Sequence, residues 1–418
     1  MGLPQEVIDY ILDMLYDDLR TLKACSLTCK AMFASTRHLI YQTLCLSHRN
    51  NQKVLTKEEK EELRHKKLDH RDLELRFLSY MGEHGLLQYA RRIDICGLDK
   101  FTPDILLPHL HYFQSLDRIH TFVIEHYDAS SWADYYTTCF VHFYPTLTSL
   151  TLCQPVGHHH LLWRFALQFP NLESLCLEWL QDQVQTQQYP PIPAIVDQFP
   201  PLRGRLRLAF GAGIQWVVQF TNNFKRGFNF QSVELESDFF GNHSQNIINA
   251  CARTLEDLTI TAAGTGTLRL SYLSSSVAGR FTNFLPIGSF KQHRPNFTEI
   301  TLLRRLTVRM PFRQAMTIEP YILLQTLSSI ASPVFREFVI ELPKLLSQFE
   351  DQTLQDWGHW VGIDKYLEGR FSRHRDFRLT IRTDKPYDQA TFQRYARIGF
   401  PLMARRRCLH FERLRDRG

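Results

Sequence analysis

The sequence lacks any long apolar run, and no stretch approaches the about 18 apolar residues that a membrane-spanning helix needs. The start also lacks a basic segment followed by an apolar one, so we expect neither a signal peptide nor a membrane span. Charge of one sign is not in large excess: 49 Lys and Arg face 43 Asp and Glu, a net charge of +6 over 418 residues. So mild a charge gives no argument for binding nucleic acid.

Paired cysteines and catalytic signatures are missing as well. The nine cysteines form no Cys-x-x-Cys motif, and most lie in apolar stretches, which is typical of small buried side chains in a reducing compartment. We therefore expect a cytoplasmic or nuclear protein. Neither Gly-x-Ser-x-Gly nor His-Glu-x-x-His occurs.

Two motifs that could carry chemistry are better explained as loops. The run His158–His160 has no carboxylate or cysteine at ligand spacing, so it indicates the start of a helix rather than a metal site. The Gly264–Gly266 segment lacks the Lys-Ser/Thr pair of a phosphate-binding loop. We accordingly expect no catalytic, cofactor-binding or metal-binding residue, and a protein that is not an enzyme.

What the chain does contain is a recurring motif, apolar-x-x-apolar-x-apolar. Its middle residues follow one another at 25 to 31 residues through much of the chain, at Ile93, Phe122, Leu150, Leu175, Leu206, Val233 and Leu258. Further copies centre on Leu44, Leu306, Phe338 and Leu379. Amphipathic stretches long enough for a helix separate many copies, as at 245–253, 320–330 and 354–371.

A repeat of this length is typical of a leucine-rich-repeat-like solenoid, in which each strand–helix unit buries its apolar residues only against its neighbours. We expect an α/β fold with an irregular solenoid, a parallel sheet on the concave face and helices on the convex face. A compact α/β domain with a parallel sheet is the alternative.

The pattern divides the chain into four segments. Residues 1–42 form a helical module, and 43–90 form a charged linker with the first helix of the solenoid. Residues 91–384 form the solenoid, whose Gly-, Ser- and Thr-rich insertion at 261–297 leaves the number of repeats open. Residues 385–418 form a C-terminal capping helix and a basic tail that contains Arg405–Arg407.

The N-terminal module carries helical signals. Pro4 suits the first turn of a helix, and Asp17 and Asp18 can cap a second one. One apolar stripe runs along the first helix and consists of Val7, Ile8, Ile11, Leu12 and Leu15. So much apolar surface on so small a module indicates a docking face.

This module resembles an F-box, the adaptor-binding module of cullin–RING ubiquitin ligases, and its sequence is similar to that of fungal F-box proteins. The matching residues are Leu3-Pro4-x-Glu6, Ile11-Leu12-x-x-Leu15, Leu22 and Cys29-Lys30. The resemblance implies a three-helix module that docks on a Skp-family adaptor through Leu3, Pro4, Ile8, Ile11, Leu12, Leu15, Leu27, Cys29, Met32 and Phe33.

Charged residues alternate with the apolar residues of the strands. Because successive side chains point to opposite faces of a strand, we expect them to line the concave face. Their mixed sign suits a protein or peptide of complementary charge, and the alternative is that neighbouring strands neutralise one another. The candidates for binding a target protein are Glu178, Arg205, Arg207, Glu234, Glu236, Arg305, Arg309 and Glu341.

Together, the resemblance and the repeat imply a substrate-receptor subunit of an SCF-type (Skp–cullin–F-box) ubiquitin ligase. Through the adaptor it would reach a cullin and a RING protein, and it would hold an unidentified target protein. The alternative is a non-catalytic interaction scaffold whose F-box no longer engages a ligase, favoured by Thr28 and Met32, where the family usually has Val and Trp. A third interpretation, an α/β enzyme, needs a polar cluster at strand ends that the sequence does not show.

Overall fold

The computed structural model describes residues 4–15, 18–47, 78–96, 109–114, 116–125, 142, 144–153, 165–178, 202–209, 228–236, 242–261, 296–309, 320–342, 360–371, 374, 376–383 and 389–413. The chain divides into two compact units, Met1–Leu202 with Gly211–Gly213 and Arg203–Phe210 with Ile214–Gly418. Several predicted features lie outside the described residues: Leu3, Asp17, His158–His160, Gly264–Gly266 and most of the 261–297 insertion. The four predicted segments stay a prediction.

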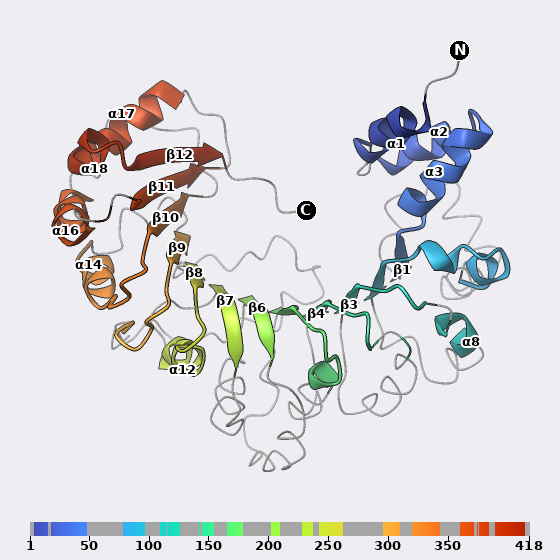
Figure 1. Ribbon diagram of the computed structural model, residues 1–418, viewed down its shortest axis with the longest axis horizontal. Helices are drawn as coiled ribbons and strands as arrows, with labels where there is room; N and C mark the ends of the chain where they lie inside the picture. Colours follow the sequence, from blue (N-terminus) through green and yellow to red (C-terminus); the bar gives the residue numbers. More distant parts are fainter. Residues whose placement is uncertain are drawn as a thin grey trace, which may run out of the picture. The chain divides into compact units, whose positions relative to one another are not determined.

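Three helices form the N-terminal part of the first unit (Figure 1): α1 (Gln5–Asp13), α2 (Leu19–Ser26) and α3 (Lys30–Ile40). Helix α3 packs against both of the others. The Asp18 carboxylate accepts a hydrogen bond from the Thr21 backbone N–H at 3.0 Å, so Asp18 caps α2 as the sequence predicts.

The first unit continues with parallel strands whose spatial order is their order in the chain. They are β1 (Thr43–Ser47), β2 (Arg92–Cys96), β3 (Thr121–Glu125), β4 (Ser149–Cys153) and β5 (Ser174–Glu178). A 3-10 turn, η1 (Leu87–Tyr89), precedes β2, and the short helix α8 (Leu110–Phe113) precedes β3.

The second unit repeats this arrangement with strands that are again parallel and in chain order. They are β6 (Arg203–Ala209), β7 (Asn229–Glu236), β8 (Asp257–Thr261), β9 (Arg305–Arg309), β10 (Glu337–Leu342), β11 (Arg378–Thr383) and β12 (Leu409–Arg413). Its helices are α12 (Asn242–Ala250), α14 (Pro320–Ser328), α16 (Val361–Phe371), α17 (Gln389–Gly399) and α18 (Pro401–Arg405).

The apolar residues of the repeated motif stand opposite one another in these sheets. Leu150 pairs with Leu175 in the first unit, and Leu306 pairs with Phe338 in the second. All four side chains are fully buried, as are their counterparts on the other inner strands. Figure 1 shows α12, α14, α16 and α18 on one face of the second unit's sheet. The apolar positions thus form the core between strands and helices. No described helix covers the other sheet face, which we call the open face.

A repeated backbone hydrogen bond marks the start of the strands. Before β2–β5 and β8–β11, the residue before or at the strand donates its N–H to the corresponding carbonyl of the preceding repeat, as from Arg304 to Glu256 and from Arg336 to Arg304, at 2.8 and 2.9 Å. The same bond links Glu173 to Thr148 in the first unit at 2.8 Å. Each turn therefore docks on its neighbour, which satisfies backbone groups that the sheet would otherwise leave unpaired.

The α/β prediction with a parallel sheet is confirmed, but the prediction for the C-terminus is incomplete. Residues 389–413 form two helices and a further strand, β12, rather than one capping helix and a basic tail. At β12 the first position of the motif is Arg406, and only Leu409 and Phe411 match it. Arg407, with φ of 61°, makes the turn from α18 into this strand.

Candidate functional site

The core of the N-terminal helices consists of Ile8, Leu12 and Leu22, and Leu15, Cys25, Ala31, Met32, Leu39 and Ile40 pack against it. Ile8 and Leu12 were predicted to contact an adaptor, but in this structure both are buried against α2 and α3. Their contact with an adaptor stays a prediction. Leu15 and Met32 are partly buried in the same way. Three helices this short have no other core, so their innermost side chains are needed for packing.

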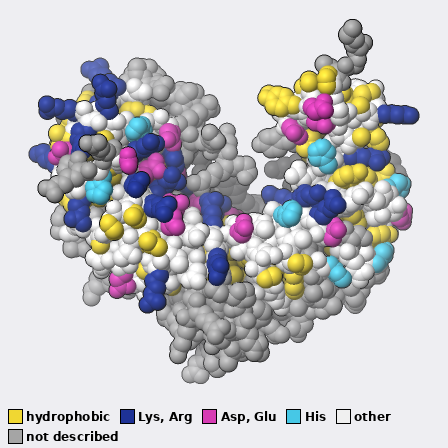
Figure 2. Space-filling model, viewed as in Figure 1, with side chains coloured by type: hydrophobic (Ala, Val, Ile, Leu, Met, Phe, Trp, Pro, Cys, Tyr) yellow, Lys and Arg dark blue, Asp and Glu magenta, His cyan; other side chains and the backbone are white. Residues whose placement is uncertain are grey.

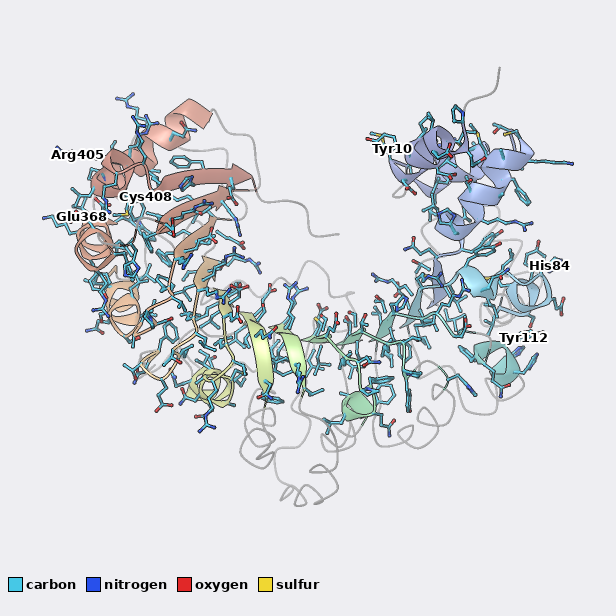
Figure 3. The ribbon with its side chains drawn as sticks, in the orientation of Figure 1. Tyr10, His84, Tyr112, Glu368, Arg405 and Cys408 are labelled. Carbon is cyan, nitrogen blue, oxygen red and sulfur yellow. The ribbon has the colours of Figure 1, made fainter. Side chains whose placement is uncertain are left out.

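A set of large apolar side chains on these helices faces solvent instead. We call it the apolar patch, and it consists of Val7, Tyr10, Ile11, Met14, Leu19, Leu27 and Phe33. Leu27 is 87% exposed. Figure 2 shows hydrophobic side chains gathered over this part of the molecule, and Figure 3 shows Tyr10 on α1. An apolar cluster of this kind, exposed on a small module, marks a binding surface.

The predicted adaptor contacts thus separate into two groups. Ile11, Leu27 and Phe33 belong to the apolar patch, and Pro4 and Cys29 are also exposed. The other four members of the patch were missed as adaptor contacts, and they are Val7, Tyr10, Met14 and Leu19. The sequence contains a pattern that could have located the residues of α1 in this patch. Residues 7, 10, 11 and 14 follow the i, i+3, i+4, i+7 spacing of a second helical stripe beside the buried one.

Polar contacts hold the backbone beneath the patch. Gln5 on α1 donates hydrogen bonds to Asp9 and Ser35 at 2.8 and 2.7 Å, which ties α1 to α3. The Thr28 hydroxyl donates to the Cys25 carbonyl at 2.7 Å and lies 2.9 Å from the sulfur of Met32. These bonds position the turn between α2 and α3, from which Leu27 projects.

The open face of the second unit carries the predicted charged residues. Register places Arg205, Ser232, Asp257, Arg305, Glu337 and Arg378 in one row across β6–β11. A second row lies two residues further along each strand, and most of its side chains are uncharged. A third row lies two residues beyond the second and contains Arg309, Glu341, Arg382 and Glu412. The sign of the charge alternates from strand to strand in the outer rows.

Ion pairs link these residues. Glu341 accepts from Arg309 at 2.9 Å and from Arg382 at 3.4 Å, and Arg382 also donates to Glu412 at 2.8 Å. Glu234 accepts from Arg205 and, at 3.1 Å, from Arg309. We call these six residues, with Arg207 at 3.8 Å from Glu234, the ion-pair ladder. Figure 2 shows acidic and basic side chains interleaved here.

The two central carboxylates of the ladder are buried, whereas Arg205 and Glu412 are about half exposed. The Glu234 and Glu341 side chains are both 2% exposed. Burial alone lowers the pKa of Arg309, but Glu341 and Glu234 outweigh it, so this pKa is raised above its ordinary value. The same balance, with Glu412 and Glu341 as partners, raises the pKa of Arg382. These charges therefore pair across strands, and the binding of a target protein by this face stays a prediction.

The remaining three candidates for target binding stand apart from the ladder. Arg305 on β9 forms a separate ion pair with Glu337 on β10 at 2.6 Å. Glu236 lies in β7 in register with Ala209. Glu178 belongs to the first unit, where it accepts from the thiols of Cys153 and Cys176 at 3.5 and 3.4 Å. Sequence alternation alone could not separate Glu178 from the others, because it reveals the face of a strand and not the neighbours on that face.

Within the described residues, no group of three or more His, Cys, Asp or Glu side chains is placed to hold a metal ion. None of the helices described is both long and apolar enough to cross a bilayer. The buried Cys251 thiol has its pKa raised to about 12 by desolvation, which makes it a poor nucleophile. The Arg405–Arg407 segment forms the end of α18 and the start of the turn that leads into β12.

Comparison with protein-family models gives no match for this sequence, and comparison with curated proteins gives none either.

Proposed function

We propose that this chain is a substrate-receptor subunit of an SCF-type ubiquitin ligase. In this proposal α1, α2 and α3 are an F-box that docks on a Skp-family adaptor, and the parallel-strand repeats are a leucine-rich-repeat-like solenoid that holds a target protein. The adaptor brings a cullin and its RING partner, so the chain works in the cytoplasm or nucleus. It performs no bond chemistry itself.

The observation that carries the proposal is the apolar patch on helices whose sequence resembles an F-box. Seven large apolar side chains remain exposed there, although Ile8, Leu12 and Leu22 already fill the core. Buried apolar anchors supply most of the energy of protein interfaces, so this surface has the composition of a docking site. A receptor of this kind accelerates ubiquitin transfer by proximity, since it makes the encounter of enzyme and target effectively unimolecular.

Thr28 and Met32, the two departures from the F-box pattern, are compatible with this proposal. Met32 packs against the helical core rather than lying in the apolar patch, and Thr28 supports it through the contact with its sulfur. Replacing the usual Trp by Met therefore changes internal packing, for which Met is adaptable. The exposed residues that would meet an adaptor are separate from both positions.

Co-expression with a Skp-family adaptor and size-exclusion chromatography test the proposal. The wild-type chain is expected to form a stable one-to-one complex. Ile11→Ser combined with Leu27→Ser should weaken it by at least about tenfold, since two interface anchors are lost. Helical content, followed by circular dichroism, should not change.

The matched control is Leu302→Ser combined with Ile398→Ser in the second unit. Leu302 is 42% exposed, as is Ile11, and Ile398 is 41% exposed against 87% for Leu27, so the control makes the same two changes of residue type at exposed apolar positions elsewhere. It should bind the adaptor as the wild type does. Failure of the wild-type chain to bind any Skp-family adaptor would reject the ligase proposal and leave the interaction scaffold.

A further inference from the structure

Two ion pairs on the open face of the second unit, Arg205–Glu234 and Arg305–Glu337, bury the carboxylate more deeply than the arginine. The Arg382–Glu412 pair, toward the other end of the strands, shows the reverse, with 23% and 49% exposure. The Glu234 side chain is almost fully buried, whereas its partner Arg205 is 48% exposed. In the neighbouring pair, Glu337 is 16% exposed and Arg305 is 44% exposed. Because the longer guanidinium side chains reach over the carboxylates, a molecule approaching this part of the face meets mainly arginine.

Two further arginines add to this surface. Arg203 at the start of β6 and Arg378 at the start of β11 are both exposed. Among the residues that the structure describes, neither guanidinium takes part in an ion pair or a hydrogen bond. Together with Arg205 and Arg305 they form what we call the arginine surface, which has donors to spare for a ligand.

Register gives the spacing of this surface. Arg205, Arg305 and Arg378 lie in one row across β6, β9 and β11. Strands lie about 4.8 Å apart, so Arg305 is roughly 14 Å from Arg205 and roughly 10 Å from Arg378 along this row. An extended chain advances about 3.3 Å per residue, so it can place a carboxylate at each arginine within a stretch of eight residues or so.

We propose that the arginine surface binds an acidic segment of a protein, in extended conformation and across the strands. The proposal rests on the proposed function, of which it names the class of target. The intervening Asp257 and Glu337 favour a peptide over a nucleic acid. A phosphate backbone would place negative charge beside these carboxylates, whereas a peptide carries charge only at chosen positions. Arginine pairs with such carboxylates in bidentate fashion.

Fluorescence anisotropy with the full chain and a fluorescein-labelled deca-glutamate peptide tests this inference at low salt. The wild-type chain is expected to bind deca-glutamate and not deca-glutamine. Arg203→Gln combined with Arg378→Gln removes two arginines that hold no partner in the fold, so the structure should be kept. This variant should bind the acidic peptide about tenfold more weakly, since two charge pairs are lost.

The matched control is Arg397→Gln combined with Arg405→Gln, which makes the same change of charge at exposed positions on α17 and α18 (Figure 3 shows Arg405). It should bind the peptide within a factor of about two of the wild type. Equal weakening by both variants would reduce the effect to net charge and overturn the proposal. The proposal would also be overturned if the wild-type chain did not bind the peptide. Tighter binding of a single-stranded DNA decamer than of the peptide would overturn it as well.

Adaptor binding separates this inference from the proposed function. The Arg203→Gln, Arg378→Gln variant should bind the Skp-family adaptor as the wild type does, because the arginines are far from the apolar patch in sequence and belong to the second unit. A chain that binds deca-glutamate but no adaptor would reject the ligase alone. A chain that binds the adaptor but not the peptide would reject the acidic target alone.

Discussion

The two units bury the same kind of residue on the helix-covered face of their sheets and present different ones on the open face. On β3–β5 of the first unit the open face carries mostly small, uncharged residues such as Thr121, Ser149 and Thr151. On β9–β11 of the second unit the positions equivalent to Thr121 and Ser149 alternate Arg with Glu, as Arg305, Glu337 and Arg378, whereas the position of Thr151 is again uncharged. The buried face specifies the repeat, whereas the open face is free to differ because no helix covers it.

The buried faces should respond alike to mutation in the two units. Leu175→Ala in β5 and Leu306→Ala in β9 each remove a fully buried side chain from the stacked core. Each should lower the free energy of unfolding by about 2–5 kcal/mol, through lost burial and the cavity left behind. Differential scanning calorimetry measures both. A loss of less than about 1 kcal/mol for either variant is smaller than a truncated core leucine usually causes. Such a result would contradict the similarity of the two buried faces.

The open faces should respond differently. Glu341→Gln removes a buried charge between Arg309 and Arg382 and should cost about 3 kcal/mol, because two guanidiniums lose a carboxylate. Thr151→Ala, on the open face of the first unit, should cost no more than about 0.5 kcal/mol. Urea titration of each variant gives the two free energies.

A double-mutant cycle sharpens this test. Arg309→Gln combined with Glu341→Gln should cost less than the sum of the two single variants, with an interaction energy of about 1–3 kcal/mol. Strict additivity of Arg309→Gln and Glu341→Gln would show that the ladder contributes no coupling, and the open faces would then not differ in this respect.

Asp364 should show a smaller effect that depends on pH. This buried α16 carboxylate accepts hydrogen bonds from the backbone N–H groups of Leu402 and Met403, at 2.7 and 3.0 Å, and so caps α18. Asp364→Ala should cost about 1 kcal/mol, since two N–H groups lose their acceptor. Its counterpart in the comparison is Asp18, which caps α2 in the first unit but is exposed.

The pH dependence of this cost follows from the pKa of Asp364, which burial raises more than the two N–H groups lower it. The folded state then binds the proton more tightly than the unfolded state. The stability contributed by Asp364 is thus complete below the unfolded pKa and falls as the pH rises through the folded pKa. The gap between wild type and Asp364→Ala should narrow from acid toward neutral pH. A gap that widens instead would show that the hydrogen bonds outweigh burial.

Much of the fold was predictable because it depends on patterns local in sequence. The apolar-x-x-apolar-x-apolar motif located β1 to β11, since alternation and a repeat length are properties of consecutive residues. The helix at 245–253 was found as α12 (Asn242–Ala250), and that at 320–330 as α14 (Pro320–Ser328). The same reasoning failed at β12, where the flanking residues depart from the pattern although the neighbouring strand β11 still supplies its hydrogen bonds.

The sequence by itself determined the parallel-strand repeat, the polar character of the open face and the cap at Asp18. Only the tertiary structure decided which apolar residues of α1 are buried, because two stripes compete and the positions of α2 and α3 select Ile8 and Leu12 over Ile11 and Tyr10. It also decided which charges are paired, since Arg309 on β9 meets Glu234 on β7 across the intervening strand β8 rather than along the chain. Burial and pairing depend on what approaches from elsewhere in the fold, and periodicity carries no information about that.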